Sequence, residues 1–89
     1  MEEIRIHPRV HTRHKEIQDA EVRAAWKKAI AFAERRTEEK DFFVAIGFDR
    51  NGRLLEIVAS RDEDGVLVVF HAMTPPSKKT LRELGLSER

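Results

Sequence analysis

Cysteine is missing altogether from the 89-residue sequence. Its absence excludes a disulfide framework and a zinc site built on thiolates. Long apolar runs are missing too, so no segment is suited to span a bilayer, and the acidic start, Met1–Arg5, lacks a signal-peptide pattern. We therefore expect a cytoplasmic protein that does not contact a membrane.

An excess of charge of one sign is also absent. The formal net charge is +1, although 37% of the residues are charged. This balance is ordinary for a soluble surface and differs from that of a strongly basic nucleic-acid-binding domain. A chain of this length forms one domain with a modest core, and we assign residues 1–89 to it.

Several familiar catalytic motifs are not found either. The chain has no Gly-rich phosphate loop, no nucleophile elbow and no pair of carboxylates at a recognisable spacing. No cofactor is expected on this basis. The chemistry available to the chain therefore rests on histidine, glutamate, arginine and lysine.

Runs of β-branched and aromatic residues fill the second half of the chain. They span residues 42–48, 53–60 and 66–73. Asn51-Gly52 and Asp64-Gly65 separate them, and these residue types accept the positive φ that a tight hairpin turn requires. The pattern predicts a three-stranded antiparallel meander.

The register of the first hairpin follows if Asn51-Gly52 supplies the two central turn residues. Phe48 then faces Leu55, and one face of the sheet collects an apolar set. The predicted members are Phe42, Val44, Ile46, Phe48, Leu55, Ile57, Ala59, Phe70 and Ala72. The more mixed opposite face holds Val69, His71, Met73, Glu56 and Ser60. This register brings His71 close to Glu56 on an open face of the sheet.

A helical pattern covers residues 19–36. Apolar residues recur at helical spacing at Val22, Ala25, Trp26, Ala29, Ile30 and Ala33. This continuous stripe predicts one long amphipathic helix. Trp26 then either anchors the helix in the core or stacks on a base, and its place in the stripe favours the core.

Two segments precede this helix. Residues 3–6 predict a short edge strand ended by Pro8, and such an edge is able to pair with another chain. Residues 7–15 hold three histidines and three cationic residues, which suits a metal site, a solvated basic loop or a phosphate-contacting loop. Pro8 and the β-branched neighbours argue against a helix here, so the histidine spacing is a weak metal pattern and we assign no metal site.

The end of the chain predicts a short helix. Residues 74–76, Thr-Pro-Pro, break regular structure, Ser77 is suited to cap a helix, and Gly85 is suited to end it. Lys78 and Lys79 follow the cap directly. They form either a phosphate site or simply solubilising charges.

This set of side chains suits RNA cleavage without a metal. A base removes the proton of a ribose 2′-OH, the oxygen attacks the adjacent phosphate, cations stabilise the developing charge, and an acid protonates the leaving oxygen. Glu56 and His71 are candidates for the base and the acid, and Arg53, Arg61 and Lys78 for phosphate contact. The alternative for His71 is a surface histidine without a catalytic role.

The order of predicted elements resembles that of BrnT-type toxins, a RelE-like group from bacterial toxin–antitoxin pairs. The residues that carry the resemblance are Arg13-His14, Ile17, Val22, Ile46-Gly47, residues 52–58, His71-Ala72 and Lys78-Lys79. Met73 departs from it, because such toxins usually have an arginine at that position, and Thr74-Pro75-Pro76 is inserted after it.

The resemblance implies an α+β fold of the RelE type, with one long amphipathic helix on a three- to four-stranded antiparallel meander sheet and a short C-terminal helix. It implies a toxin that acts as a metal-independent endoribonuclease on RNA (mRNA), is neutralised by a cognate antitoxin and forms oligomers through that complex. The residues expected in proton transfer are His71, Glu56 and His14, and those expected to contact phosphate are Arg13, Arg53, Arg61, Lys78 and Lys79. The alternative is a non-catalytic protein- or nucleic-acid-binding module of the same fold.

Overall fold

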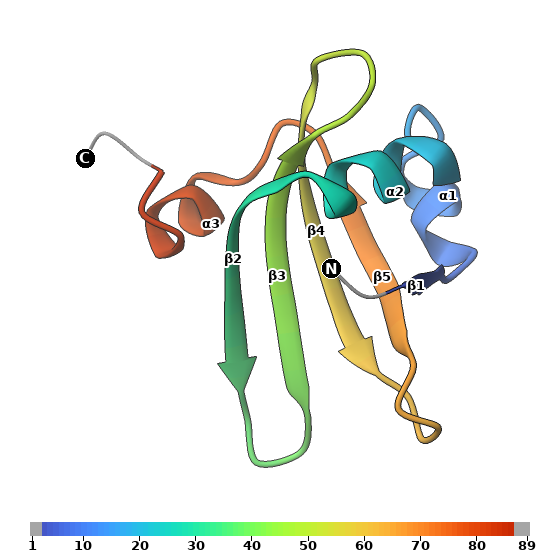
Figure 1. The fold of residues 1–89 in the computed structure, drawn as a ribbon, viewed down its shortest axis with the longest axis vertical. Helices are drawn as coiled ribbons and strands as arrows, with labels where there is room; N and C mark the ends of the chain where they lie inside the picture. Colours follow the sequence, from blue (N-terminus) through green and yellow to red (C-terminus); the bar gives the residue numbers. More distant parts are fainter. Residues whose placement is uncertain (1–2, 87–89) are drawn as a thin grey trace.

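A computed structural model describes residues 3–86 of the chain. Its elements, in order, are β1 Ile4–Ile6, α1 Arg9–Arg13, α2 Asp19–Lys27, β2 Ala29–Arg36, β3 Asp41–Phe48, β4 Leu54–Arg61, β5 Leu67–Met73 and α3 Lys78–Glu83. One sheet in the order β1-β5-β4-β3-β2 contains all five strands, with β1 parallel to β5 and every other pair antiparallel (Figure 1). The predicted α+β class and the meander are confirmed, whereas the predicted count of three or four strands is wrong.

The predicted long helix is also wrong. Helix α2 has nine residues and ends at Lys27, after which residues 29–36 form β2 and pair with β3. In this segment Ile30 and Phe32 alternate with alanines, a pattern that fits a strand as well as a helix. Pairing with β3 decides between the two, because it gives this edge strand backbone partners on its β3 side and extends the sheet.

The meander forms with a register that differs by one residue from the predicted one. Phe48 pairs with Leu54, so the connection consists of residues 49–53 and not of two central residues. Asp49 organises this longer turn, because its Oδ1 accepts the N–H groups of Asn51 and Arg53, each at 2.8 Å. An aspartate that bonds its own turn in this way replaces the tight hairpin that Asn51-Gly52 predicted.

This shift exchanges the two faces of β3. Ala45 pairs with Ile57 and Gly47 with Leu55, so the odd-numbered residues of β3 join the core. Val44 lies opposite Val58 on the other face, where it is fully buried. The predicted core face was therefore right for β4 and wrong for β3.

Strand β5 contains a bulge. Val58 pairs with His71 while Ala59 pairs with Val69, which leaves Phe70 as an extra residue. Val69 consequently lies in the core, and Phe70 lines a hollow on the opposite face together with His71. The predicted faces of Ala72 and His71 hold, and those of Val69 and Phe70 are wrong because the bulge changes the alternation.

Helix α2 covers the core face of the sheet. Its apolar residues Val22, Ala25 and Trp26 pack in one cluster with residues of β4 and β5. Trp26 is 3% exposed, which confirms that it anchors the core. A Cβ atom on Gly47 would lie 2.1 Å from the carbonyl oxygen of Ala25, so glycine at this position permits the close approach of α2 to β3.

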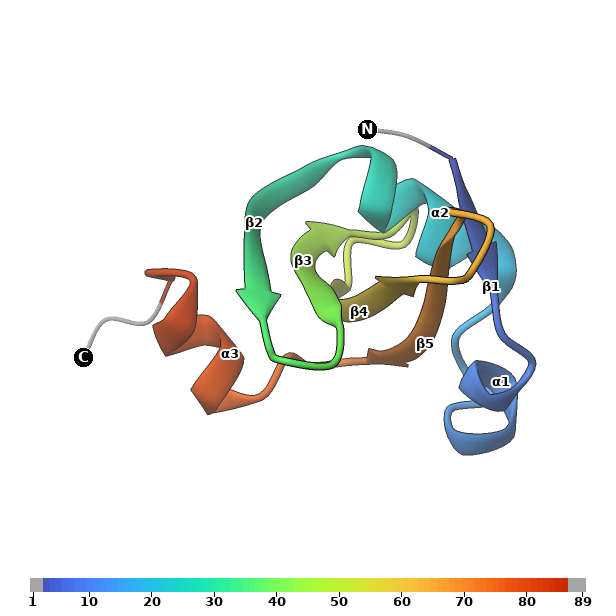
Figure 2. The same ribbon diagram turned by 90° about the horizontal axis from the view of Figure 1, so that it is seen from below.

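Two short helices frame the sheet. Residues 9–13 form α1, with Pro8 at its N-cap and Val10 1% exposed, so the prediction of no helix here is wrong; proline is tolerated because the first N–H groups of a helix have no partner inside it. Ser77 caps α3 as predicted by accepting the Thr80 N–H at 3.2 Å. In Figure 2, α3 lies across the sheet from α2.

None of the helices between residues 3 and 86 has the length and apolarity needed to cross a membrane.

Candidate functional site

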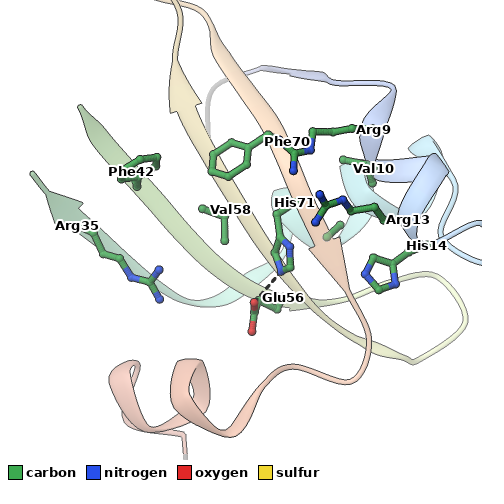
Figure 3. A pocket seen from close by; sticks show the side chains of 11 residues that line it. Arg9, Val10, Arg13, His14, Arg35, Phe42, Glu56, Val58, Phe70 and His71 are labelled. Carbon is green, nitrogen blue, oxygen red and sulfur yellow. Dashed lines mark hydrogen bonds and ion pairs between the residues drawn. The ribbon is translucent and has the colours of Figure 1, made fainter. Parts of the chain in front are cut away.

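The central contact of the site joins neighbouring strands on the face opposite α2. The Nε2 atom of His71 in β5 lies 2.8 Å from Oε2 of Glu56 in β4 (Figure 3). A carboxylate only accepts hydrogen bonds, so Nε2 carries the proton and Nδ1 keeps a free lone pair in the neutral ring. The predicted proximity of these two residues is confirmed. It survives because the register error between β3 and β4 does not involve β5, and because the connection at residues 62–66 and the bulge at Phe70 offset each other between β4 and β5.

Glu56 is buried and held on both of its oxygens. Its Oε1 accepts the backbone N–H of Ser77 at 3.0 Å and the Ser77 hydroxyl at 2.9 Å. Burial raises the pKa of Glu56, but hydrogen bonds from His71, Ser77 and Thr80 outweigh it and lower the pKa to about 2. The carboxylate is therefore ionised at neutral pH and its acceptor positions are occupied, which favours a role in positioning His71.

A cavity of about 340 Å³ opens in front of this pair. Its lining consists of Arg9, Val10, Arg13, His14, Arg35, Phe42, Glu56, Val58, Phe70, His71 and Ala72. Arg35 reaches it from β2 and is held by Glu83 of α3, with Nε at 2.7 Å from Oε2. Between residues 3 and 86, the side chains of Arg9 and Arg13 have no hydrogen-bond or ion-pair partner. The cavity therefore presents positive charge that is free to meet an anion.

A second imidazole reaches the same cavity. The ring of His14, at the end of α1, lies with its centroid 6.5 Å from that of His71 and its plane at 88° to it. Its Nδ1 is 3.7 Å from a carboxylate oxygen of Glu16. Figure 3 shows His14 and Arg13 beside His71, so α1 and β5 bring together three of the predicted residues.

The other predicted cations lie elsewhere. Arg53 is bound to Asp49, with Nε 2.7 Å from Oδ2, and belongs to the turn at residues 49–53. Arg61 lies over the ring of Phe43 at 5.4 Å and donates to the Gly65 carbonyl at 2.9 Å. Lys78 and Lys79 are exposed at the start of α3. None of these four cations lines the cavity around His71.

Sequence reasoning missed Arg9, Arg35 and Ser77. Arg35 was assigned to a helix; as a strand residue it pairs with Phe42, on the same face as Glu56. Treating residues 29–36 as a strand would have placed it there. Ser77 was predicted only as a cap, and its contact with Glu56, 21 residues earlier, has no local pattern in the sequence. The guanidinium groups from α1 and β2 occupy the cavity, where the resemblance implied an arginine at position 73.

In the part of the chain that the structure describes, no three His, Asp or Glu side chains gather as metal ligands. Comparison of the chain with protein-family models, with curated proteins and with solved structures found no match. A function for this chain is therefore argued from the geometry of the site, because fold alone does not determine activity.

Proposed function

We propose that this protein is a metal-independent endoribonuclease that acts as the toxin of a type II toxin–antitoxin module. One observation carries the proposal. His71, backed by the buried carboxylate of Glu56, faces a second imidazole, His14, in a cavity lined by guanidinium groups. Two imidazoles around an anion-binding cavity supply a base, an acid and charge stabilisation in one place.

The reaction is an in-line transfer at phosphorus. The free Nδ1 of neutral His71 removes the proton of a ribose 2′-OH, and the 2′ oxygen attacks the adjacent phosphorus. His14 in its protonated form gives a proton to the departing 5′ oxygen. The bond from phosphorus to that oxygen breaks, and the products are a 2′,3′-cyclic phosphate and a 5′-hydroxyl end. Glu56 keeps His71 in the tautomer whose Nδ1 has a free lone pair and stabilises the imidazolium that forms.

The guanidinium groups stabilise the charge of the pentacoordinate phosphorus. Arg9 and Arg13 are free to turn toward a phosphate. A planar guanidinium group is able to donate hydrogen bonds to two phosphate oxygens at once. Arg35 is oriented by Glu83 at the far side of the cavity. We therefore assign direct contact with the substrate to the arginines of α1, and a positive charge held in a fixed position to Arg35 of β2.

The direct test uses purified protein and a short RNA in the presence of EDTA. The wild type is expected to release a 2′,3′-cyclic phosphate, and an RNA with 2′-deoxyribose at the cleaved position should stay intact. His71→Gln keeps an N–H donor for Glu56 but has no proton-transfer group, so it should lose cleavage. Lys28→Gln is the matched control, because Lys28 is exposed at the end of α2 and does not line the cavity. Cleavage by His71→Gln at the wild-type rate would overturn the proposed role.

The toxin part of the proposal concerns cells and a partner protein. Induced expression in a bacterial host should arrest growth and degrade RNA, and His71→Ala should do neither. A cognate antitoxin should suppress the arrest and co-purify with the chain. Growth with intact RNA, while the wild-type protein accumulates in folded form, would contradict this part of the proposal.

A non-catalytic nucleic-acid-binding module is the second candidate. The free side chains of Arg9 and Arg13 favour it, because unpaired cations in a hollow bind phosphate whether or not chemistry follows. Such a module would bind RNA without cleaving it and would lose affinity gradually as single cations are removed. Cleavage that depends on His71 separates the two candidates.

A further inference from the structure

A second hollow, of about 550 Å³, adjoins the cavity around His71. Arg9, Phe42 and Phe70 line both, so these residues form the boundary between them. The second hollow is also lined by Lys40 and by Arg5 of β1. The two spaces are therefore adjacent and share part of their walls on the face of the sheet opposite α2.

Two of the three residues shared by the hollows are aromatic. The centroids of Phe42 and Phe70 lie 5.9 Å apart with the ring planes at 66°, and both residues are only partly buried. Figure 3 shows both rings on the same side of the sheet as His71. Partly exposed rings beside cations form the surface on which proteins stack the bases of single-stranded nucleic acids.

The cations that line the second hollow differ in whether another residue already binds their side chains. Arg5 lies 3.6 Å from Asp62, and Arg61 is engaged with Phe43 and the Gly65 carbonyl. By contrast, the side chains of Arg9 and Lys40 have no hydrogen-bond or ion-pair partner among residues 3–86. Two cations without a partner in the described part of the chain therefore line the same hollow as the aromatic pair.

We propose that the second hollow binds the nucleotide next to the cleaved one, with its base against Phe42 and Phe70 and its phosphate between Arg9 and Lys40. This inference rests on the proposed ribonuclease function and names its substrate class as single-stranded RNA. A paired base hides its faces in the stack of the duplex, so a double-stranded segment would not use the aromatic pair. The neighbouring nucleotide then positions the scissile phosphate between His71 and His14.

The test compares two RNA substrates that share one scissile step, a dinucleotide and a tetranucleotide. With the wild type, kcat/KM should be at least about tenfold higher for the longer RNA, because one stacked base adds about five- to hundredfold in affinity. Phe70→Leu should remove most of this gain, and Lys40→Gln should remove part of it. Phe48→Leu is the matched control, because Phe48 is a 48% exposed aromatic on β3 that lines neither hollow.

Failure of the inference and failure of the proposed function give different results. Cleavage of both RNAs at equal efficiency would overturn the proposed nucleotide site in the second hollow and would leave the proposed ribonuclease function standing. If neither RNA is cleaved, binding of a fluorescent single-stranded tetranucleotide still tests the hollow: Phe70→Leu should weaken it about fivefold or more, and Phe48→Leu should not. Equal binding by both variants, or equal affinity of the wild type for a poly-glutamate peptide, would overturn the inference. Phe42→Leu gives a second variant if Phe70→Leu does not fold.

Discussion

Two buried carboxylates in this molecule have similar bonds and different consequences. Asp49 accepts the Nε–H of Arg53 at 2.7 Å, and Glu56 lies 2.8 Å from Nε2 of His71. Each also accepts backbone N–H groups, and each has a lowered pKa. For both carboxyl groups burial alone would raise the pKa, and hydrogen bonds reverse the direction.

The difference lies in where the donors come from. The donors to Asp49 are at most four residues away in the chain, so this carboxylate closes a turn. The donors to Glu56 come from β5 and α3, 15 and 21 residues away, so it joins three elements. Its side-chain partner in β5 is also an imidazole, a group of the kind that serves as a general acid or base, whereas the partner of Asp49 is a guanidinium. Of these two buried carboxylates, only Glu56 has an imidazole partner that lines a cavity, and this difference is why the proposed site is placed there.

The largest expected effect distinguishes His71, the partner of Glu56, from Arg53, the partner of Asp49. His71→Gln should lower kcat for RNA cleavage by about 10²- to 10⁴-fold, since that is the usual contribution of a positioned proton-transfer group. Arg53→Gln should leave kcat unchanged once the folded fraction is taken into account, because Arg53 does not line the cavity. Single-turnover cleavage with circular dichroism as a folding check makes the comparison. Equal losses in both variants would remove the distinction drawn here.

Changes in the carboxylates come next. Glu56→Gln should lower kcat by about tenfold to a hundredfold, because Glu56 acts through His71 and not on the substrate itself. A positioning role further predicts a change in the pH dependence of kcat, because the amide no longer stabilises the imidazolium. The measurement is a pH–rate profile of the variant beside the wild type. An unchanged profile with lowered kcat would indicate a merely structural role.

Asp49→Ala should act on stability alone. Removing this acceptor breaks its hydrogen bonds with the partly buried N–H groups of Asn51 and Arg53, and at about 0.5–1.5 kcal/mol for each bond this costs about 1–3 kcal/mol in the free energy of unfolding. Cleavage per folded molecule should not change. Urea unfolding combined with an activity assay at low denaturant checks both parts, and a loss of activity in the folded variant would connect the turn to the site.

The contribution of the two buried carboxylates to the free energy of unfolding should depend on pH in the acidic range, which is a smaller effect. A lowered pKa in the folded state adds stability that is fully present above the unfolded value, 4.5 for Glu56, and is lost as pH falls toward the folded value of about 2. The free energy of unfolding should therefore fall between about pH 4.5 and pH 2, and Glu56→Gln should make this fall shallower. Urea unfolding at a series of acidic pH values measures it. An identical fall in the variant would show that other carboxyl groups dominate.

The smallest effect concerns an exposed pair. Both ring nitrogens of His11 face acceptors, the Ile17 carbonyl at 2.8 Å and the Asp19 carboxylate, and the hydrogen bond with Asp19 raises the pKa of His11. The stability that this bond adds is complete below the unfolded pKa, about 6.5, and is lost as pH rises through the raised value. The amount should stay below about 1 kcal/mol, because solvent screens an exposed pair. His11→Gln should remove this neutral-pH dependence from the unfolding free energy.

The parts of the fold that local patterns specify could be predicted. Alternating residues and Gly-containing turns gave the meander, and Ser77 gave the cap of α3. The segment from Ala29 to Arg36 could not be assigned, because alanines satisfy helical and strand periods equally and pairing with β3 decides between them. The register of β3 depended on the side chain of Asp49, which no count of turn residues includes.

The site was predictable to a similar degree. Glu56 and His71 were brought together by strand alternation, and the prediction holds because the odd-numbered connection at residues 62–66 and the one-residue bulge at Phe70 offset each other. Arg35 was lost with the helix error, and Ser77 reaches Glu56 through a tertiary contact that the sequence does not show. Arg53 and Arg61 were predicted from their residue type, and only the structure shows that other partners hold them.

The bulge in β5 allows the ring of Phe70 to be removed without moving His71 away from Glu56. Without Phe70 the strand alternates regularly, since Leu67, Val69 and Ala72 lie in the core. Phe70 is therefore one inserted side chain in an otherwise unbroken pattern, and the residues on either side of it keep their faces. Shortening the strand by this one residue would take away the ring and leave His71 opposite Val58, within reach of Glu56. The proposed base-stacking residue and the proposed proton-transfer residue are thus neighbours in one strand, and a single-residue deletion would remove the first while keeping the second.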